Sequence, residues 1–401
     1  MKLLRRMIAG MLCLMAPLAA QVNSRAELIE SERTTKARYL KGVEETRWTA
    51  LAHSGLLLKI FDTLSAGKDG LRLRAGGLPP GTGFAAGPEY RHTFGNEAAI
   101  FRASARGTIG RSYLTDAELS LPRLAGEHLF LDFYAQRADY PRLRYYGPGP
   151  SSALADAANY RLENTAFESS AGVKPLARLK IGVSGGYQVY NVGPGQSHDV
   201  VSADRLFSEV PGMARQTSFV RAGPFIQLDY RDNTGSPNKG GNYLLRYFTY
   251  SDRDLRQFSF TRIEGELQQY IPFFNERRII ALRAKSILSE SHNGQFVPFY
   301  LQPSLGGAYD LRGFPAFRYY DNNALVLNGE YRFDLFTGVR MAIFADAGKV
   351  SGRRQELNFS GLKKDYGFGF RSNIGNSAGL RLDFAFSREG AQAWLAFDDA
   401  F

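Results

Sequence analysis

Apolar and polar residues alternate with a period of two along most of the chain after about residue 68. In ALVLNGEYRFDL (residues 324–335) the odd-numbered positions are apolar apart from one glycine, whereas the even-numbered positions from 328 onward are Asn, Glu, Arg and Asp. GVRMAIFADAGKV (residues 338–350) repeats the pattern, with Arg340 and Asp346 on the polar side. Because successive side chains of a β-strand point to opposite faces, each stretch predicts a strand with one apolar and one polar face.

About sixteen such runs lie between Gly70 and Phe401, at a mean spacing of about twenty residues that suits tilted membrane strands and their turns. We therefore predict an all-β membrane protein, a 16-stranded antiparallel transmembrane β-barrel over residues 68–401. An even number of strands closes the sheet without a free edge. A soluble barrel, with its apolar residues inside, shows the same alternation. The N-terminal residues and the charges on the polar face favour the membrane version.

Residues 1–20 have the pattern of a secretory signal peptide, with a basic start, an apolar stretch and small residues at Ala19 and Ala20. The apolar stretch is shorter than the about 20 residues that a membrane-spanning helix needs, and Leu12 argues against lipidation of Cys13. Cleavage removes the one cysteine, so neither disulfides nor thiol chemistry are expected. Without another long apolar run, the chain must cross a membrane as strands, and we expect the bacterial outer membrane.

Residues 21–67 lack strand alternation and are expected to form a short periplasmic helical segment and linker before the barrel. The part from Ser24 to Leu64 is rich in Glu, Lys, Arg, Ala and Leu, with apolar residues at helical spacing. The segment could be a plug, a helix in the lumen or an arm that docks a partner. A helix on the membrane surface without a specific ligand is an equal alternative.

Composition agrees with a membrane barrel and narrows the choice of partners. The chain has 42 glycines, 21 tyrosines and 29 phenylalanines, and a net charge of +11. Its arginines are spread one per strand or loop rather than gathered on one surface, which argues against nucleic acid as a partner. Outer-membrane lipids with anionic head groups, including lipopolysaccharide, fit this charge better.

Two motifs that suggest chemistry do not fit their usual context. GVSGG (residues 182–186) matches a serine nucleophile pattern, but that pattern needs a sharp strand-to-helix turn, and Ser184 lies inside a predicted strand. The five histidines are far apart and lack the spacing of metal ligands. We therefore expect neither an enzyme nor a metal or other cofactor.

Four stretches resemble the superfamily of outer-membrane assembly and translocation barrels that includes BamA, TamA and the two-partner secretion transporters, also called bacterial surface antigens. They are DYRDNTGSPNKGG from Asp229, LRGF from Leu311, NGEYRF from Asn328 and FADAG from Phe344. The resemblance covers most of the chain from about residue 68 to the end. It implies a long extracellular loop that folds back into the barrel, with Leu311 in place of the usual valine.

The resemblance also implies a lumen latch, in which the tip arginine of this loop meets acids on the barrel wall. Here the latch comprises Arg312, Gly313 and Phe314 of the loop and Glu330, Phe344, Asp346 and Gly348 of the wall. The alternation places Glu330 and Asp346 on the polar faces of adjacent strands, so Arg312 is expected to pair with one or both. Such a pairing also fits a role that only maintains the barrel's shape.

The same resemblance implies a weakly paired seam between the first strand, near residues 70–77, and the last. We expect Gly76, Gly77, Gly390 and Phe401 at this seam, where glycine weakens pairing and a substrate strand or lipid enters by edge pairing. The terminal FDDAF resembles the family's C-terminal sorting signal, with Asp399 where an apolar residue is usual.

Residues 21–67 are too few for the POTRA modules that capture substrates in BamA-type proteins, so we expect a barrel-only member. An unfolded outer-membrane or secreted protein is then the expected substrate, and a separate periplasmic partner could deliver it. The predicted function is insertion or export of proteins, or handling of envelope lipids. The alternative is a passive pore or structural barrel without insertase activity.

Overall fold

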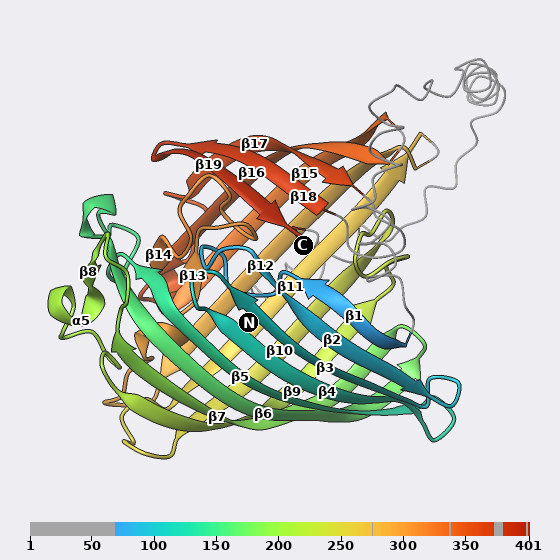
Figure 1. The fold of residues 1–401 in the computed structure, drawn as a ribbon, viewed down its shortest axis with the longest axis horizontal. Coiled ribbons are helices and arrows are strands. Elements are labelled where there is room, and N and C mark those ends of the chain that lie inside the picture. The colour runs from blue at the N-terminus through green and yellow to red at the C-terminus, as the bar shows by residue number, and fades with distance from the viewer. Residues whose placement is uncertain (1–68, 275, 337, 373–379, 398–399) are drawn as a thin grey trace. The chain divides into compact units, whose positions relative to one another are not determined.

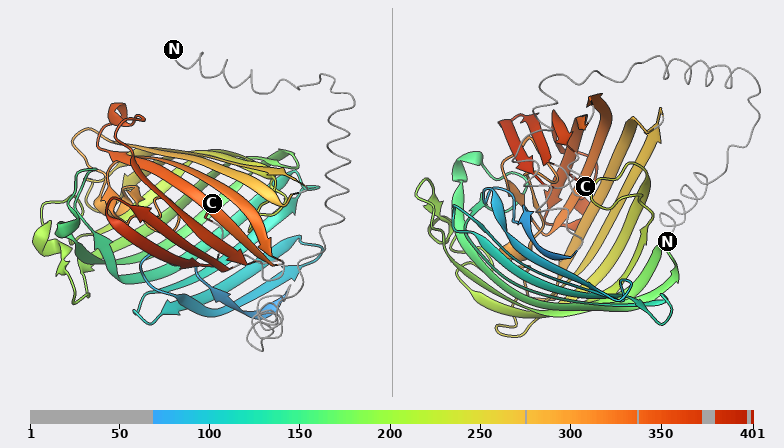
Figure 2. Two further views of the ribbon diagram at one scale, coloured as in Figure 1. Left: turned by 90° about the horizontal axis from the view of Figure 1, so that it is seen from above. Right: turned by 45° about the vertical axis from the view of Figure 1, so that its right-hand side comes forward.

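The computed structural model describes residues 69–274, 276–336, 338–372, 380–397 and 400–401. Within them, sixteen strands pair in chain order, each antiparallel to the next, in one curled sheet (Figures 1 and 2). This confirms the predicted fold class. The predicted signal peptide and helical segment, residues 1–67, lie outside the described residues.

The sixteen strands are β1 (Gly70–Ala75), β2 (Ala85–Phe94), β3 (Ala99–Thr108), β4 (Tyr113–Leu124), β5 (Leu129–Tyr145), β6 (Ala158–Leu176), β7 (Leu179–Pro194), β9 (Gln216–Asp229), β10 (Gly240–Asp252), β11 (Phe260–Phe273), β12 (Arg278–Ser291), β15 (Asn323–Phe336), β16 (Val339–Ser351), β17 (Lys363–Ser372), β18 (Leu380–Ser387) and β19 (Gly390–Ala396). The connections contain β8 (Val201–Ser202), β13 (Ser304–Leu305), β14 (Tyr319–Tyr320), α5 (Ala203–Leu206), η2 (Leu154–Asp156), η3 (Phe299–Leu301) and η4 (Arg354–Glu356). None of the helices in the described part of the chain is long and apolar enough to cross a membrane.

The connections alternate between two ends of the sheet because consecutive strands are antiparallel. The longest ones, residues 146–157, 195–215, 292–322 and 352–362, lie at one end, which we call the loop end. β1 begins and β19 ends at the other end, which we call the turn end. The loop that carries LRGF, which the resemblance implies to be extracellular, is therefore at the loop end.

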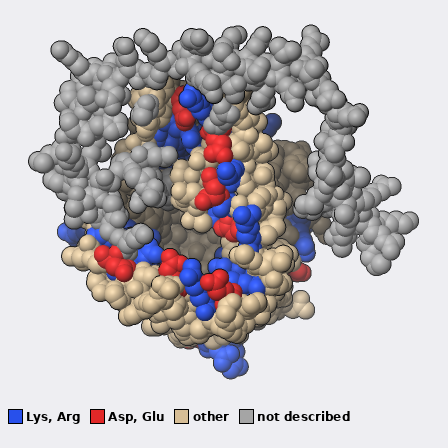
Figure 3. Space-filling view, turned by 90° about the vertical axis from the view of Figure 1, so that its right-hand side faces the viewer, with Lys and Arg blue, Asp and Glu red and all other residues tan. Residues whose placement is uncertain are grey.

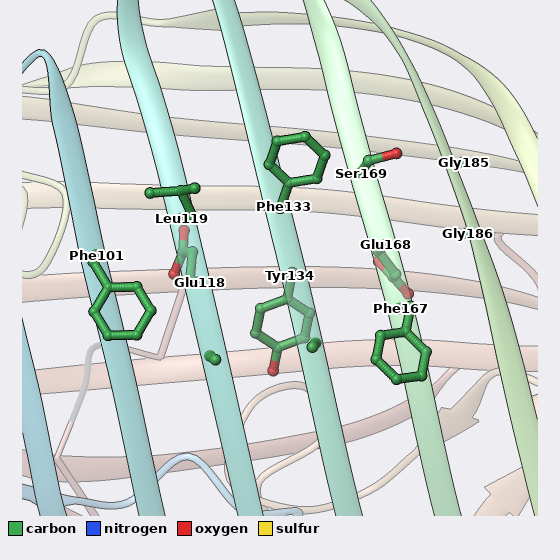
Figure 4. A pocket seen from close by; sticks show the side chains of 12 residues that line it. Phe101, Glu118, Leu119, Phe133, Tyr134, Phe167, Glu168, Ser169, Gly185 and Gly186 are labelled. Carbon is green, nitrogen blue, oxygen red and sulfur yellow. The ribbon is translucent and has the colours of Figure 1, made fainter.

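The two faces of the sheet differ as the alternation predicts. On the outward face Phe133, Phe167 and Ile343 are 45%, 60% and 51% exposed, whereas the inward Glu330 and Asp346 are buried. Figure 3 shows acidic and basic atoms side by side around the hollow of the sheet. A hollow of about 440 Å³ lies over β3–β7, where aromatic rings stand around smaller side chains (Figure 4).

Aromatic side chains form a buried core inside the sheet at its loop end. The Phe299 ring, from the 292–322 loop, lies with its centroid 5.0 Å from that of Tyr145 on β5 and 4.9 Å from that of Tyr160 on β6. Tyr320, from the same loop, lies 5.1 Å from Tyr145. All four side chains are buried. The loop therefore packs against the wall through apolar contacts as well as through charge.

Candidate functional site

The 292–322 loop, which connects β12 to β15, folds inward and buries its own middle. Leu305, Leu311, Phe314 and Tyr319 form an apolar cluster with the wall residues Ala324, Val326 and Val350. Burial of these side chains stabilises the inward conformation through the hydrophobic effect. The short β13–β14 ladder pairs Leu305 with Tyr319, which closes the segment between them into a compact tip carrying Arg312.

Arg312 lies at this tip and is almost completely buried, with 1% of its side chain exposed. Its Nε and Nη2 each donate a hydrogen bond of 2.8 Å to Asp346 on β16, a bidentate pair, and Nη1 donates to Glu330 on β15. Its guanidinium carbon lies 3.4 Å from the centroid of the Phe344 ring. The two parallel hydrogen bonds to Asp346 use the planar guanidinium, whose donors fit the two oxygens of a carboxylate. A lysine ammonium cannot form such a pair of bonds.

The pair belongs to a larger network across β15–β18. Glu330 also accepts hydrogen bonds from Arg332 at 2.7 Å and from Arg371 at 3.1 Å. Asp383 on β18 lies 3.5 Å from Arg312 and pairs with Arg371 and with Arg381. Glu330, Asp346 and Asp383 thus each have at least one arginine beside them, which is what burial of a charge requires.

The two glycines of the predicted latch make room for close approach. A Cβ on Gly313 would lie 2.5 Å from the Cβ of Asp365 and 3.0 Å from that of Ser387. A Cβ on Gly348 would lie 3.1 Å from Leu305 and 3.2 Å from Leu311. Side chains at these two positions would therefore push the loop away from the wall.

The structure thus brings together all seven residues predicted for the latch. The network also contains four residues that were not predicted for the latch, namely Arg332, Arg371, Arg381 and Asp383. A signal for these residues existed, because the alternation places each on the polar face of its strand. The sequence does not show that β17 and β18 reach the same loop tip.

The predicted seam glycines lie at strand ends. Gly76 and Gly77 follow β1 with φ of 76° and 80°, and Gly390 begins β19 with φ of 117°. Glycine adopts such positive φ angles without steric cost. The three residues therefore allow the backbone to turn at the ends of these strands. A Cβ on Gly77 would also lie 1.9 Å from Nη1 of Arg106, which donates a hydrogen bond to the Gly76 carbonyl at 3.0 Å.

Phe401 does not lie at the seam, which corrects the sequence-based expectation. Its ring stacks on Tyr270 of β11 with centroids 6.2 Å apart, and its carbonyl oxygen accepts a hydrogen bond from the Tyr270 hydroxyl. The guanidinium carbons of Arg283 and Arg332 lie 5.9 and 5.7 Å from its ring centroid. The expectation assumed an extended strand to the last residue, but β19 ends at Ala396.

Two other features of the sequence suggested chemistry, the GVSGG motif and the possibility of a metal site. Ser184 lies within β7, paired with Ser170 and Gly223, and not at a strand-to-helix turn. Among the described residues, no group of three or more His, Cys, Asp or Glu side chains is arranged to hold a metal ion.

These features define an outer-membrane β-barrel with an internal loop anchored by a buried arginine. The Omp85 superfamily domain matches residues 101–393, and the chain belongs to this superfamily of bacterial outer-membrane proteins. It is thus an outer-membrane barrel of the assembly and translocation class. A comparison with curated protein sequences finds no match.

Solved structures agree on the fold. BamA from Haemophilus ducreyi lacking POTRA domains 1–3 is similar with a TM-score of 0.60 and 13% identity, over 82% of this chain and 69% of that one. CdiB from Acinetobacter baumannii has a TM-score of 0.51 and 13% identity, over 81% and 57%, so this chain spans less than two thirds of that protein. CdiB from Escherichia coli has a TM-score of 0.50 and 15% identity, over 85% and 67%.

Proposed function

We propose that this protein inserts or exports unfolded polypeptides at the outer membrane through the seam between β1 and β19. The observation that supports this most is the lack of a ladder between these two strands in the described pairings, although both are otherwise part of one continuous sheet. Each free edge carries backbone groups that an incoming strand can pair with. Opening and closing the seam requires no covalent step.

The loop inside the barrel would regulate this opening. The latch holds the loop against β15–β18 through buried ion pairs, and the loop in turn fills the loop end of the lumen. A passive pore is less well supported, because an aromatic core in the lumen leaves little room for ions. Low single-channel conductance of the purified barrel is expected, and large steady currents would favour the pore.

A disulfide across the seam tests the proposal. A Cβ on Gly76 would lie 3.6 Å from the Cβ of Phe397, within the range of about 3.5–4.5 Å found in disulfides. The Gly76→Cys/Phe397→Cys variant should insert an unfolded barrel protein into liposomes when reduced and lose this activity when oxidised. The two single-cysteine variants control for the strain that Cys adds at the positive φ of Gly76. Equal activity of the oxidised and reduced double variant would refute the seam mechanism.

The proposed mechanism also implies partners for this barrel. BamA and CdiB are similar in fold, and an unfolded outer-membrane or secreted protein is the substrate that the proposed mechanism requires. The 21–67 segment or a separate periplasmic protein would deliver it. Contact with lipopolysaccharide is supported by the positive net charge of the chain; the outward Arg137 and Arg161 are already paired with Glu163 and Asp139.

A further inference from the structure

The 292–322 loop contacts the C-terminal edge of the sheet directly. Nε1 of Trp394 on β19 donates a hydrogen bond of 2.7 Å to the Arg312 carbonyl, and the Ser387 hydroxyl at the end of β18 donates one of 2.6 Å to the Gly313 carbonyl. The Tyr319 hydroxyl donates to Glu389, in the turn between β18 and β19, at 2.8 Å. These bonds hold the loop to the strand on one side of the seam.

The same loop also contacts the N-terminal part of the sheet. A Cβ on Gly307 would lie 3.0 Å from the Cβ of Pro80, and one on Gly81 would lie 3.0 Å from the Cβ of Ala316. Pro80 and Gly81 belong to the connection that follows β1. The Gly149 amide, in the connection between β5 and β6, donates to the loop carbonyl of Tyr320 at 2.6 Å. The loop therefore lies against both sides of the seam.

The side chain of Arg318 joins the two sides by itself. Its Nε donates to Glu389 Oε2 at 2.7 Å, while Nη1 and Nη2 donate to the hydroxyl and carbonyl of Ser152 at 2.9 and 2.8 Å. Ser152 lies in the connection between β5 and β6. The Arg318 side chain is 3% exposed, and its guanidinium carbon lies 5.0 and 4.5 Å from the ring centroids of Tyr146 and Tyr319. Lysine cannot satisfy acceptors in three directions with this planar geometry.

We propose that Arg318 is a positioning residue that holds the seam closed at its loop end, by tying the β18–β19 turn to the β5–β6 connection. This inference rests on the proposed opening of the seam and adds the contact that must break first. Because a charged hydrogen bond that is shielded from water is strong, the closed seam should be much more populated with Arg318 than without it.

The rate of disulfide formation in the Gly76→Cys/Phe397→Cys barrel reports on seam closure without any substrate. In the purified folded protein, Arg318→Ala should slow this reaction about tenfold, because the rate follows the fraction of molecules in which the seam is closed and that fraction becomes small without Arg318. Glu389→Gln removes the charge on one side only and should slow it less. A rate unchanged by both substitutions would overturn the inference.

Arg262→Ala is the matched control. Arg262 is also a buried arginine, and it donates both to Ser289 on β12 and to the Leu301 carbonyl of the same loop, away from the seam. Its loss loosens the loop without touching either edge, so the disulfide rate should stay the same. An equal slowing by Arg262→Ala would mean that any loosening of the loop opens the seam, and the specific role of Arg318 would be refuted. One further outcome would refute only the proposed function. In it, Arg318→Ala slows disulfide formation, but the oxidised Gly76→Cys/Phe397→Cys barrel still inserts the unfolded protein.

Discussion

Arg312→Ala is the most direct test of the latch, because it removes one side chain that three acids share. After the change, Glu330 keeps Arg332 and Arg371 as partners. Asp346 keeps the Asn328 amide, at 2.8 Å, and the Asp365 carboxyl as side-chain hydrogen-bond partners, but it has no other arginine among the ion pairs of the described residues. The penalty therefore falls mainly on one buried carboxylate.

The size of the penalty follows from burial. Arg312 is 1% and Asp346 0% exposed in their side chains, so water screens the pair poorly. Removing one partner of a buried ion pair costs about 3–5 kcal/mol, and the lower value applies because Glu330 remains paired. We expect Arg312→Ala to lower the free energy of unfolding by about 3 kcal/mol, measured by urea titration, and to lower the temperature at which the folded band disappears on semi-native gels.

A second substitution separates the ion pair from loss of packing. If the unpaired charge of Asp346 causes the loss, Asp346→Asn in the Arg312→Ala background should restore about 1–2 kcal/mol, because an amide costs less to bury than a carboxylate. The same Asp346→Asn change alone should destabilise the barrel, since it weakens an existing pair. Strictly additive effects would show that the two side chains do not interact, and the latch would be refuted.

Three further changes test other parts of the lumen. Phe299→Ala empties a fully buried aromatic site, so unfolding should become easier by about 3–5 kcal/mol in urea, with larger single-channel currents. Burial raises the pKa of Asp310, so loop docking is strongest below the ordinary aspartate range and weakens as the pH rises through the raised pKa. Asp310→Asn should make this decline smaller when protease cleavage of the loop is followed from about pH 3 to about pH 8. Tyr270→Phe removes the hydrogen bond to Phe401 and should cost about 1 kcal/mol in urea titrations. If Tyr270→Phe leaves the free energy of unfolding unchanged, the contact between Tyr270 and Phe401 does not stabilise the barrel.

Much of the fold could be predicted from the sequence because its physical cause is local. The period of two sets which side chains share a face, so Glu330 and Asp346 could be assigned to the lumen without coordinates. The two residues could also be placed on adjacent strands, because only one short turn separates these strands in the sequence. The contact of Asp383 with Arg312 depends on the path of the 292–322 loop, and no local pattern encodes that path.

Phe401 shows where such local reasoning ends. Leu395 and Phe401 have the same parity, and Leu395 is indeed outward, with 55% of its surface exposed. Parity assigns faces only while the backbone stays extended, and β19 ends at Ala396. Phe401 can therefore enter the lumen, where Tyr270 and two arginines surround its ring.

Plugging the lumen and closing the seam depend on one segment of chain. Phe299 fills the loop end of the lumen, Arg312 binds the wall, and Arg318 joins the two sides of the seam, all within the 292–322 loop. If the seam opens by parting the β18–β19 turn from Ser152, Arg318 loses the hydroxyl and the carbonyl of Ser152 as acceptors. The loop is then held more weakly, and the aromatic side chains that it carries, such as Phe299, can leave the lumen together with it. An opening of the seam would thus also clear a path through the lumen, which an exporter needs and a static structural barrel does not.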